Sequence, residues 1–228
     1  TREHYKGRNY FVGVFRQFVL LPQQVGKLTI DPAQVQLTIT KVIDLGDSYD
    51  SWFNGQSNEV VVNKKIVTPK ITIDVKALPS GKPADFSGGV GEFNISSSIN
   101  AKDVKTNDAI TIKLVISGTG NLKLISNPKI NFPESFEVYD PKVDNQFRLS
   151  QDGFTGNKVI EYLAIPREPG SFTIPAANFS YFDLRTKSYK TLKTEAYTIN
   201  VEKGKGNSDQ VIANFTNQED LKVLGEDI

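Results

Sequence analysis

The residues best suited to contact another molecule are two neighbouring aromatic side chains, Trp52 and Phe53. Large rings beside polar residues can anchor a protein partner or stack on a sugar ring. The alternative is that both rings pack against the protein's own fold. Trp52 and Phe53 are therefore candidate partner contacts, and the packing alternative stays open.

An acidic stretch comes just before these rings, with carboxylates at Asp44, Asp47 and Asp50. Carboxylate and carbonyl oxygens are the ligands that Ca²⁺ prefers, and about six or more of them are needed. The spacing is not that of an EF-hand. We expect a solvated acidic loop, and calcium binding by residues 44–50 stays open.

This sequence contains few residues suited to a catalytic or cofactor site. Cysteine is absent, which removes thiol nucleophiles, disulfides and thiolate-bound zinc. The one histidine, His4, would make a Ser-His-Asp triad depend on a chain terminus. Gly118-Thr119-Gly120 has no third glycine and no βαβ context, so it predicts a turn between strands instead of a phosphate cradle. We therefore predict no enzyme activity, no metal and no cofactor; a hydrolase would need a deep pocket with convergent carboxylates.

Charge and composition restrict the partners. Lys and Arg number 27 against 26 Asp and Glu, whereas nucleic-acid binders usually carry a basic excess. Neither nucleic acid nor an anionic membrane surface is expected. The longest compact apolar stretch, around residues 18–21, is far shorter than the ~20 residues of a spanning helix, and the first residues do not form a signal peptide. Any membrane contact would therefore use an anchor outside this sequence.

An internal repeat in the sequence predicts the strands that position these residues. Residues 18–35 match residues 162–179 without a gap, and Pro22 and Pro166, for example, are 144 positions apart. In each copy an apolar strand is expected to end at the proline, which cannot donate to a β-ladder. A turn follows in which a glycine tolerates positive φ, and then a second strand begins.

Both copies also end alike. Residues 71–76 and 197–202 alternate apolar and polar side chains, which predicts strands with one buried face. Val75 follows Val35 by 40 residues, but Val201 follows Phe179 by only 22, so the first copy carries 18 additional residues, around 42–64. Only the second copy is preceded by a long strand-rich segment, with strands expected at 110–116, 136–139 and 158–162. We expect the first copy to be a sandwich lacking its N-terminal strands.

The fold class predicted from these patterns is all-β, with tandem immunoglobulin-like β-sandwich domains, the first incomplete at its N-terminus. The expected boundaries are the C-terminal part of a first sandwich at 1–76, a linker at 77–89, a complete sandwich at 90–203, and a linker with the start of a further segment at 204–228.

Several short sequences in the second copy resemble the BatD aerotolerance family of Bacteroidetes and its wider oxygen-tolerance family. They are Gly91-Glu92-Phe93-Asn94-Ile95-Ser96, Ser117-Gly118-Thr119-Gly120-Asn121-Leu122-Lys123-Leu124, Phe136-Glu137-Val138-Tyr139-Asp140-Pro141-Lys142, Glu161-Tyr162-Leu163-Ala164-Ile165-Pro166-Arg167 and Phe179-Ser180-Tyr181-Phe182-Asp183. The resemblance implies the extracytoplasmic, periplasmic part of a membrane-anchored protein. It also implies partners among other Bat proteins with von Willebrand A domains, and it supplies no catalytic motif.

Two functions follow as expectations. The first is a non-catalytic protein-interaction scaffold in a Bat-type aerotolerance complex. The alternative is a carbohydrate- or envelope-binding β-sandwich module, which depends on Trp52 and Phe53. Loss of glycan binding on Trp52→Ala would favour the alternative.

Overall fold

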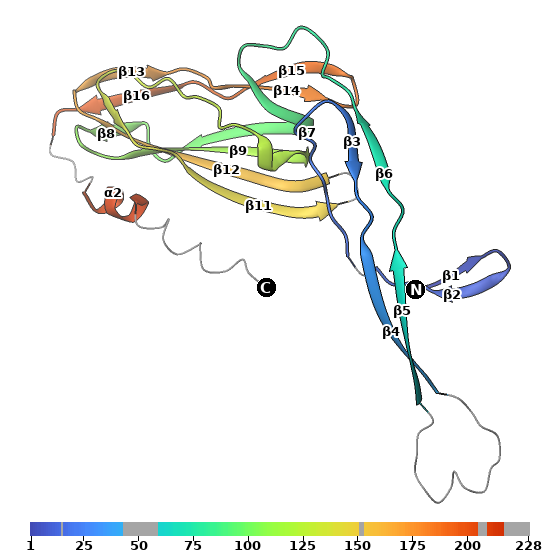
Figure 1. Cartoon of the computed structure of the whole chain (residues 1–228). Coiled ribbons are helices and arrows are strands. Elements are labelled where there is room, and N and C mark those ends of the chain that lie inside the picture. The colour runs from blue at the N-terminus through green and yellow to red at the C-terminus, as the bar shows by residue number, and fades with distance from the viewer. Residues whose placement is uncertain (15, 43–58, 151–152, 205–208, 217–228) are drawn as a thin grey trace, which may run out of the picture. The chain divides into compact units, whose positions relative to one another are not determined.

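The structure is a computed structural model that describes residues 1–14, 16–42, 59–150, 153–204 and 209–216. Strands make up most of these residues, so the all-β prediction is confirmed (Figure 1). The chain divides into a larger unit of Thr1–Leu21 and Pro79–Ile228 and a smaller unit of Pro22–Leu78. We describe each unit by itself.

The larger unit contains a short exposed hairpin and two larger sheets. The first of these sheets has the order β10-β12-β9-β7-β14-β15, with β11 also paired to β12, and the second has the order β13-β16-β8. The hairpin strands are β1 (Arg2–Tyr5) and β2 (Arg8–Phe11). The strands of the first sheet are β7 (Phe86–Ile99), β9 (Ile110–Gly120), β10 (Phe136–Val138), β11 (Lys142–Ser150), β12 (Gly153–Pro166), β14 (Asn178–Asp183) and β15 (Ser188–Lys193). Those of the second are β8 (Asp103–Lys105), β13 (Gly170–Ile174) and β16 (Tyr197–Glu202), and the helices are η1 (Leu122–Leu124) and α2 (Asp209–Thr216).

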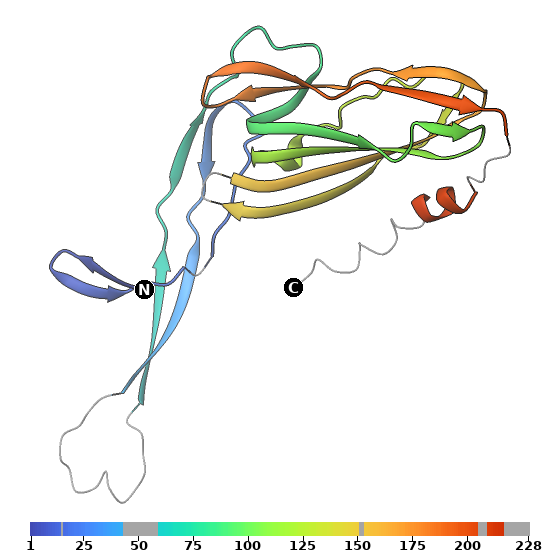
Figure 2. The same ribbon diagram turned by 180° about the vertical axis from the view of Figure 1, so that it is seen from behind.

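The two sheets face each other across one apolar core and form a β-sandwich, which Figure 2 shows from behind. Successive side chains of a strand point to opposite faces, so an alternating sequence buries every second residue. From the first sheet, β9 buries Ile110, Ile112, Leu114 and Ile116 in this way. From the second sheet, β16 alternates likewise. The long apolar alternations read from the sequence therefore form the core.

The smaller unit consists of two antiparallel pairs, β3 (Gly26–Ile30) with β6 (Ile71–Val75) and β4 (Gln34–Val42) with β5 (Glu59–Val67). These strands correspond to β13–β16 of the larger unit. We call β3–β6 the open repeat and β13–β16 the covered repeat.

The two repeats share the same strand register. Gly26 lies opposite Val75 in the open repeat, and Gly170 lies opposite Val201 in the covered repeat. Both glycines have positive φ, +108° and +151°, as the sequence predicted. The strand pair β3–β6 of the open repeat is therefore arranged as β13–β16 is in the covered repeat.

The corner at which the chain passes from one strand pair to the other is also the same. In the covered repeat the Ala177 N–H donates to Thr194 Oγ1 over 2.9 Å, and the Thr194 N–H donates to the Ala177 carbonyl over 3.0 Å. In the open repeat Ala33 and Thr68 make the same two bonds, at 2.8 and 2.9 Å. Each corner is thus closed by the same two hydrogen bonds between an alanine and a threonine.

The β4–β5 ladder is longer than the β14–β15 ladder of the covered repeat. Asp183 pairs with Ser188 at the tip of the β14–β15 hairpin, and the equivalent pair in β4–β5 is Ile39 with Val62. The β4–β5 ladder continues for three more pairs, as far as Val42 with Glu59.

Three expectations were wrong in detail. The strand expected at 18–21 is absent: this segment has no regular structure, whereas residues 162–166 are the end of β12. A strand needs a neighbour for its backbone groups; β12 has β9, β10 and β11, and no strand pairs with 18–21 among the described residues. The linker expected at 77–89 overlaps β7, which begins at Phe86 and pairs with β14.

The third correction concerns Gly118-Thr119-Gly120, which forms the end of strand β9 and not a turn. Gly118 lies between Phe93 of β7 and Gly156 of β12. A Cβ on Gly118 would lie 2.1 Å from the Glu92 carbonyl oxygen, so the glycine permits the close approach of neighbouring backbones. Strand glycines, like turn glycines, can require positive φ, and a single sequence does not distinguish the two.

Candidate partner-binding face

The aromatic candidates Trp52 and Phe53 and the acidic stretch of Asp44, Asp47 and Asp50 lie outside the described residues. Their roles as partner contacts and as a calcium loop stay predictions. The carbohydrate-binding alternative depends on the same two rings and stays a prediction with them.

The other sequence candidates are not brought together. His4 lies on the exposed β1–β2 hairpin, where its Nδ1 is 3.0 Å from Asn9 Oδ1. Gly118 lies inside the sheet, as described above. Across the described ranges, no group of three or more His, Cys, Asp or Glu side chains is placed to hold a metal ion.

Two buried polar side chains of β12 hold the segment that follows η1. Lys158 donates from Nζ to the Ile125 carbonyl, and the Tyr162 hydroxyl donates to the Pro128 carbonyl. Burial lowers the pKa of Lys158 and raises that of Tyr162 to about 12. Perturbed groups of this kind often mark functional sites, but each of these two satisfies a buried backbone carbonyl. Their role is to anchor residues 125–128 against the sheet.

A buried carboxylate organises the β14–β15 turn. Asp183, only 2% exposed, pairs with Lys190 Nζ and accepts the backbone N–H groups of Arg185 and Thr186 at 2.8 and 2.9 Å. The hydrogen bond from Lys190, followed by that from the Thr186 N–H, lowers the pKa of Asp183 to about 2. This turn could not be predicted from the sequence, because Asp183 and Lys190 come together only once strands β14 and β15 form a hairpin.

We expect Asp183→Asn to destabilise the larger unit at neutral pH and to have a progressively smaller effect in acid. The folded pKa lies below the usual value of 3.8, so the ionised carboxylate stabilises the fold above about pH 4, and this contribution is lost as the pH falls towards 2. Urea unfolding of both proteins at pH 7, 4, 3 and 2 measures the difference. A difference that persists unchanged at pH 2 would show that the charge of Asp183 is not its cause.

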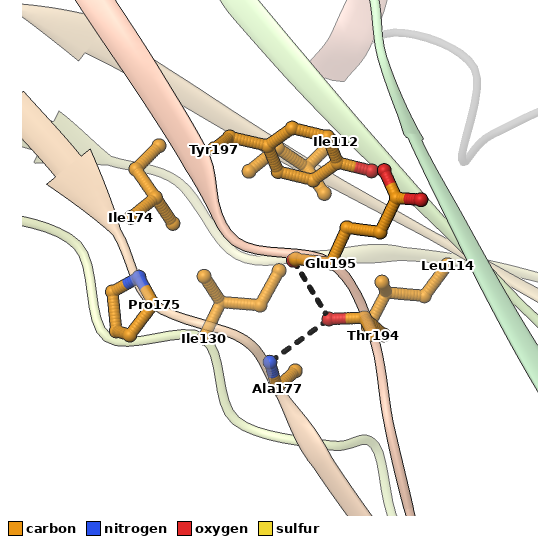
Figure 3. Close-up of a pocket in the computed structure, with 9 residues that line it drawn as sticks. All are labelled: Ile112, Leu114, Ile130, Ile174, Pro175, Ala177, Thr194, Glu195 and Tyr197. Carbon is orange, nitrogen blue, oxygen red and sulfur yellow. Dashed lines mark hydrogen bonds between the residues drawn. The ribbon is translucent and has the colours of Figure 1, made fainter.

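The hollow in Figure 3 lies at the corner of the covered repeat, between the two sheets. Thr194 and Ala177 form its floor through their hydrogen bond, and Glu195 and aliphatic side chains such as Ile112 and Ile174 line the rest. Its volume of about 10 Å³ leaves room for about one water molecule. It is too small for a substrate.

The strongest candidate is the apolar face of the open repeat. Tyr197 and Ile199 of β16 are 5% and 0% exposed, whereas their equivalents on β6, Ile71 and Ile73, are 49% and 42% exposed. The other members of this face are half-buried, whereas their equivalents in the core are buried. The members of this face are Ile30, Val35, Leu37, Ile71, Ile73 and Val75, equivalent to Ile174, Phe179, Tyr181, Tyr197, Ile199 and Val201 of the core. Apolar surface that is not buried in a core is available to a partner.

The reason for the contrast is the set of strands that covers each repeat. In the larger unit β7, β9 and β12 lie in the same sheet as β14, and β8 extends the sheet of β16. In the smaller unit β3 pairs only with β6 and β4 only with β5, as far as the described strands go. The same alternating sequence therefore makes a core in one unit and an exposed face in the other.

A known family model matches part of the chain. Residues 97–201, from the end of β7 into β16, match the family model BatD, described as a BatD DUF11 like domain. The chain carries a BatD-family domain. The match covers most of the covered repeat and the strands that pack on it, and it confirms the resemblance seen in the sequence. No curated protein and no solved structure matches the chain.

The BatD-family domain and the open repeat contain, among their described residues, no helix with the length and apolar character needed to cross a membrane.

Proposed function

We propose that this chain is a non-catalytic protein-interaction scaffold in the extracytoplasmic part of a membrane-anchored Bat-type aerotolerance protein. The BatD-family domain supports the association with Bat-type aerotolerance proteins. The family resemblance suggests Bat proteins with von Willebrand A domains as partners.

The observation that carries the interaction role is the exposed apolar face of the open repeat. A side chain such as Ile73 gains roughly 25 cal/mol for every Å² of apolar surface that a partner removes from water. Fully buried apolar side chains near the centre of an interface usually dominate binding. The buried polar groups Asp183 and Lys158 of the larger unit, in contrast, are engaged in holding its own fold.

The test is binding of the full chain to a purified von Willebrand A domain of a Bat protein from the same organism. We expect a dissociation constant in the micromolar range or lower, and a loss of about tenfold or more when Leu37 and Ile73 are both replaced by Thr, because two apolar contacts of about 1 kcal/mol or more each are lost. Threonine keeps the strand propensity of these positions.

The control is Thr72→Ser, which changes a side chain of β6 on the opposite face from Ile73. It should bind as the unmodified chain does. Absence of binding at micromolar concentration, or equal binding by the Leu37→Thr/Ile73→Thr variant, would contradict the proposed role.

A further inference from the structure

Strand β11 borders the large sheet of the BatD-family domain, with other strands of that domain before and after it in the chain (Figure 1). One edge of β11 pairs with β12 from Lys142 to Ser150, and none of the described strands pairs with its other edge. The strand contains no proline and pairs without a register shift, so nothing in its backbone interrupts that edge. The backbone N–H and C=O groups of such an edge are a template for a further strand.

The side chains of β11 on the core side of the sheet are only partly covered. Val143 lies opposite Ile160 of β12, and Leu149 lies opposite Phe154. Ile160 is fully buried, whereas Val143 and Leu149 are 40% and 44% exposed. The cover that buries Ile160 therefore does not extend over β11, and this border has apolar side chains beside its unpaired backbone edge.

The sequence of β11 is complementary to itself when two copies run antiparallel. In the register that puts Gln146 opposite its own copy, Asp144 lies opposite Arg148. In the same register Val143 lies opposite Leu149. A two-fold axis repeats each pair, so two opposite-charge pairs and two apolar pairs form at once. Each pair joins side chains of the same face, because the opposed positions differ by an even number of residues.

The neighbouring registers lack this match. Centring the pairing on Asn145 puts Lys142 opposite Arg148, which is a like-charge pair and destabilising. Centring it on Phe147 puts Arg148 opposite Gln146 and leaves no opposite-charge pair. Registers between these would oppose side chains of different faces. The charges therefore specify a single register, and they specify it for a strand with the sequence of β11.

We propose that the larger unit forms a symmetric dimer in which β11 pairs antiparallel with β11 of a second copy, with Gln146 on the two-fold axis. The two large sheets then join into one continuous sheet, and Val143 and Leu149 of both copies meet on its core side. Lys142 lies outside the paired centre, because its Nζ is 4.5 Å from the ring centroid of Phe215 in α2. This interface belongs to the larger unit, whereas the apolar face of the open repeat belongs to the smaller one.

Charge exchange tests the dimer by analytical ultracentrifugation of the full chain. The average mass of the unmodified chain should rise from monomer towards dimer between about 1 and 100 µM. Asp144→Arg opposes two arginines at each end of the interface, and Arg148→Asp opposes two aspartates. Each variant alone should therefore associate about tenfold more weakly or less, because both opposite-charge pairs become like-charge pairs.

An equimolar mixture of Asp144→Arg and Arg148→Asp should associate again, because every arginine of one variant then faces an aspartate of the other. Arg8→Asp makes the same change of charge on the exposed β1–β2 hairpin, and it should dimerise as the unmodified chain does.

A single cysteine tests the register without changing the charges. The chain has no cysteine, so Gln146→Cys introduces one thiol that lies opposite its own copy. Mild oxidation should link most of this variant into covalent dimers. Asn94→Cys, exposed on β7 of the same sheet and away from β11, should stay mostly monomeric.

An unmodified chain that stays monomeric at about 100 µM would overturn the proposal. So would single charge variants that dimerise like the unmodified chain, a mixture no more associated than its components, or equal cross-linking of Gln146→Cys and Asn94→Cys. None of these measurements uses a von Willebrand A domain, so failure of the dimer and failure of the proposed function are separate results.

Discussion

Replacing Gly118 by Ala is expected to lower the free energy of unfolding of the larger unit by about 4 kcal/mol or more, enough to unfold many domains of this size. Gly118 has φ of +150°, which L side chains rarely adopt. Its added Cβ would lie 2.1 Å from the Glu92 carbonyl oxygen and 2.9 Å from the Phe93 Cα. The obstacle is backbone on the neighbouring strand β7, so the clash cannot be relieved by moving a flexible side chain.

The matched control is Gly81→Ala. Gly81 also has positive φ, +89°, but nothing lies within 4 Å of the Cβ that would be added. This variant tests backbone strain without the clash, and we expect it to cost about 1 kcal/mol. Thermal and urea unfolding of the two variants separates the contributions, and equal losses in both would contradict the close packing of β7 and β9 at Gly118.

The second large effect is expected at a position of the repeat that is fully buried in the covered copy and half-buried in the open copy. Phe179 is fully buried and packs against Phe93 and Tyr181, with ring centroids 6.1 and 5.5 Å away. Phe179→Ala should cost about 3–5 kcal/mol, because it removes a large apolar side chain and leaves a cavity. The equivalent residue of the open repeat, Val35, is only half-buried, and Val35→Ala should cost under about 1 kcal/mol.

Hydrogen exchange resolved along the chain measures both effects in the same protein. Phe179→Ala should increase exchange throughout β13–β16, and Val35→Ala should change exchange in β3–β6 only slightly. If Val35→Ala exposed the open repeat as strongly as Phe179→Ala exposes the covered one, the open repeat would have a core of its own and would not offer an apolar face. The comparison therefore tests the feature on which the proposed function depends.

Several parts of this fold could be predicted from the sequence because they depend on short-range patterns. Alternation of apolar and polar residues predicted strands such as β9, β6 and β16, since a strand turns successive side chains to opposite faces. The matched spacing of residues in the two copies predicted that the segments 26–35 and 170–179 fold alike, and they share register and corner hydrogen bonds.

Other features were decided by neighbours that lie far away in the sequence. Ile73 and Ile199 occupy the same place in the same pattern, but only Ile199 has a second sheet to cover it. Residues 18–21 resemble the end of β12 and still form no strand, because backbone groups pair only where a second strand is present. Gly118 became a strand residue because two neighbouring strands approach it closely.

The alternation in each strand is therefore a property of the sequence itself, and it determined which side of each strand is apolar. Whether that side becomes a core or an exposed face was decided by the tertiary structure, because burial requires a second layer of strands that the alternating segment cannot supply for itself.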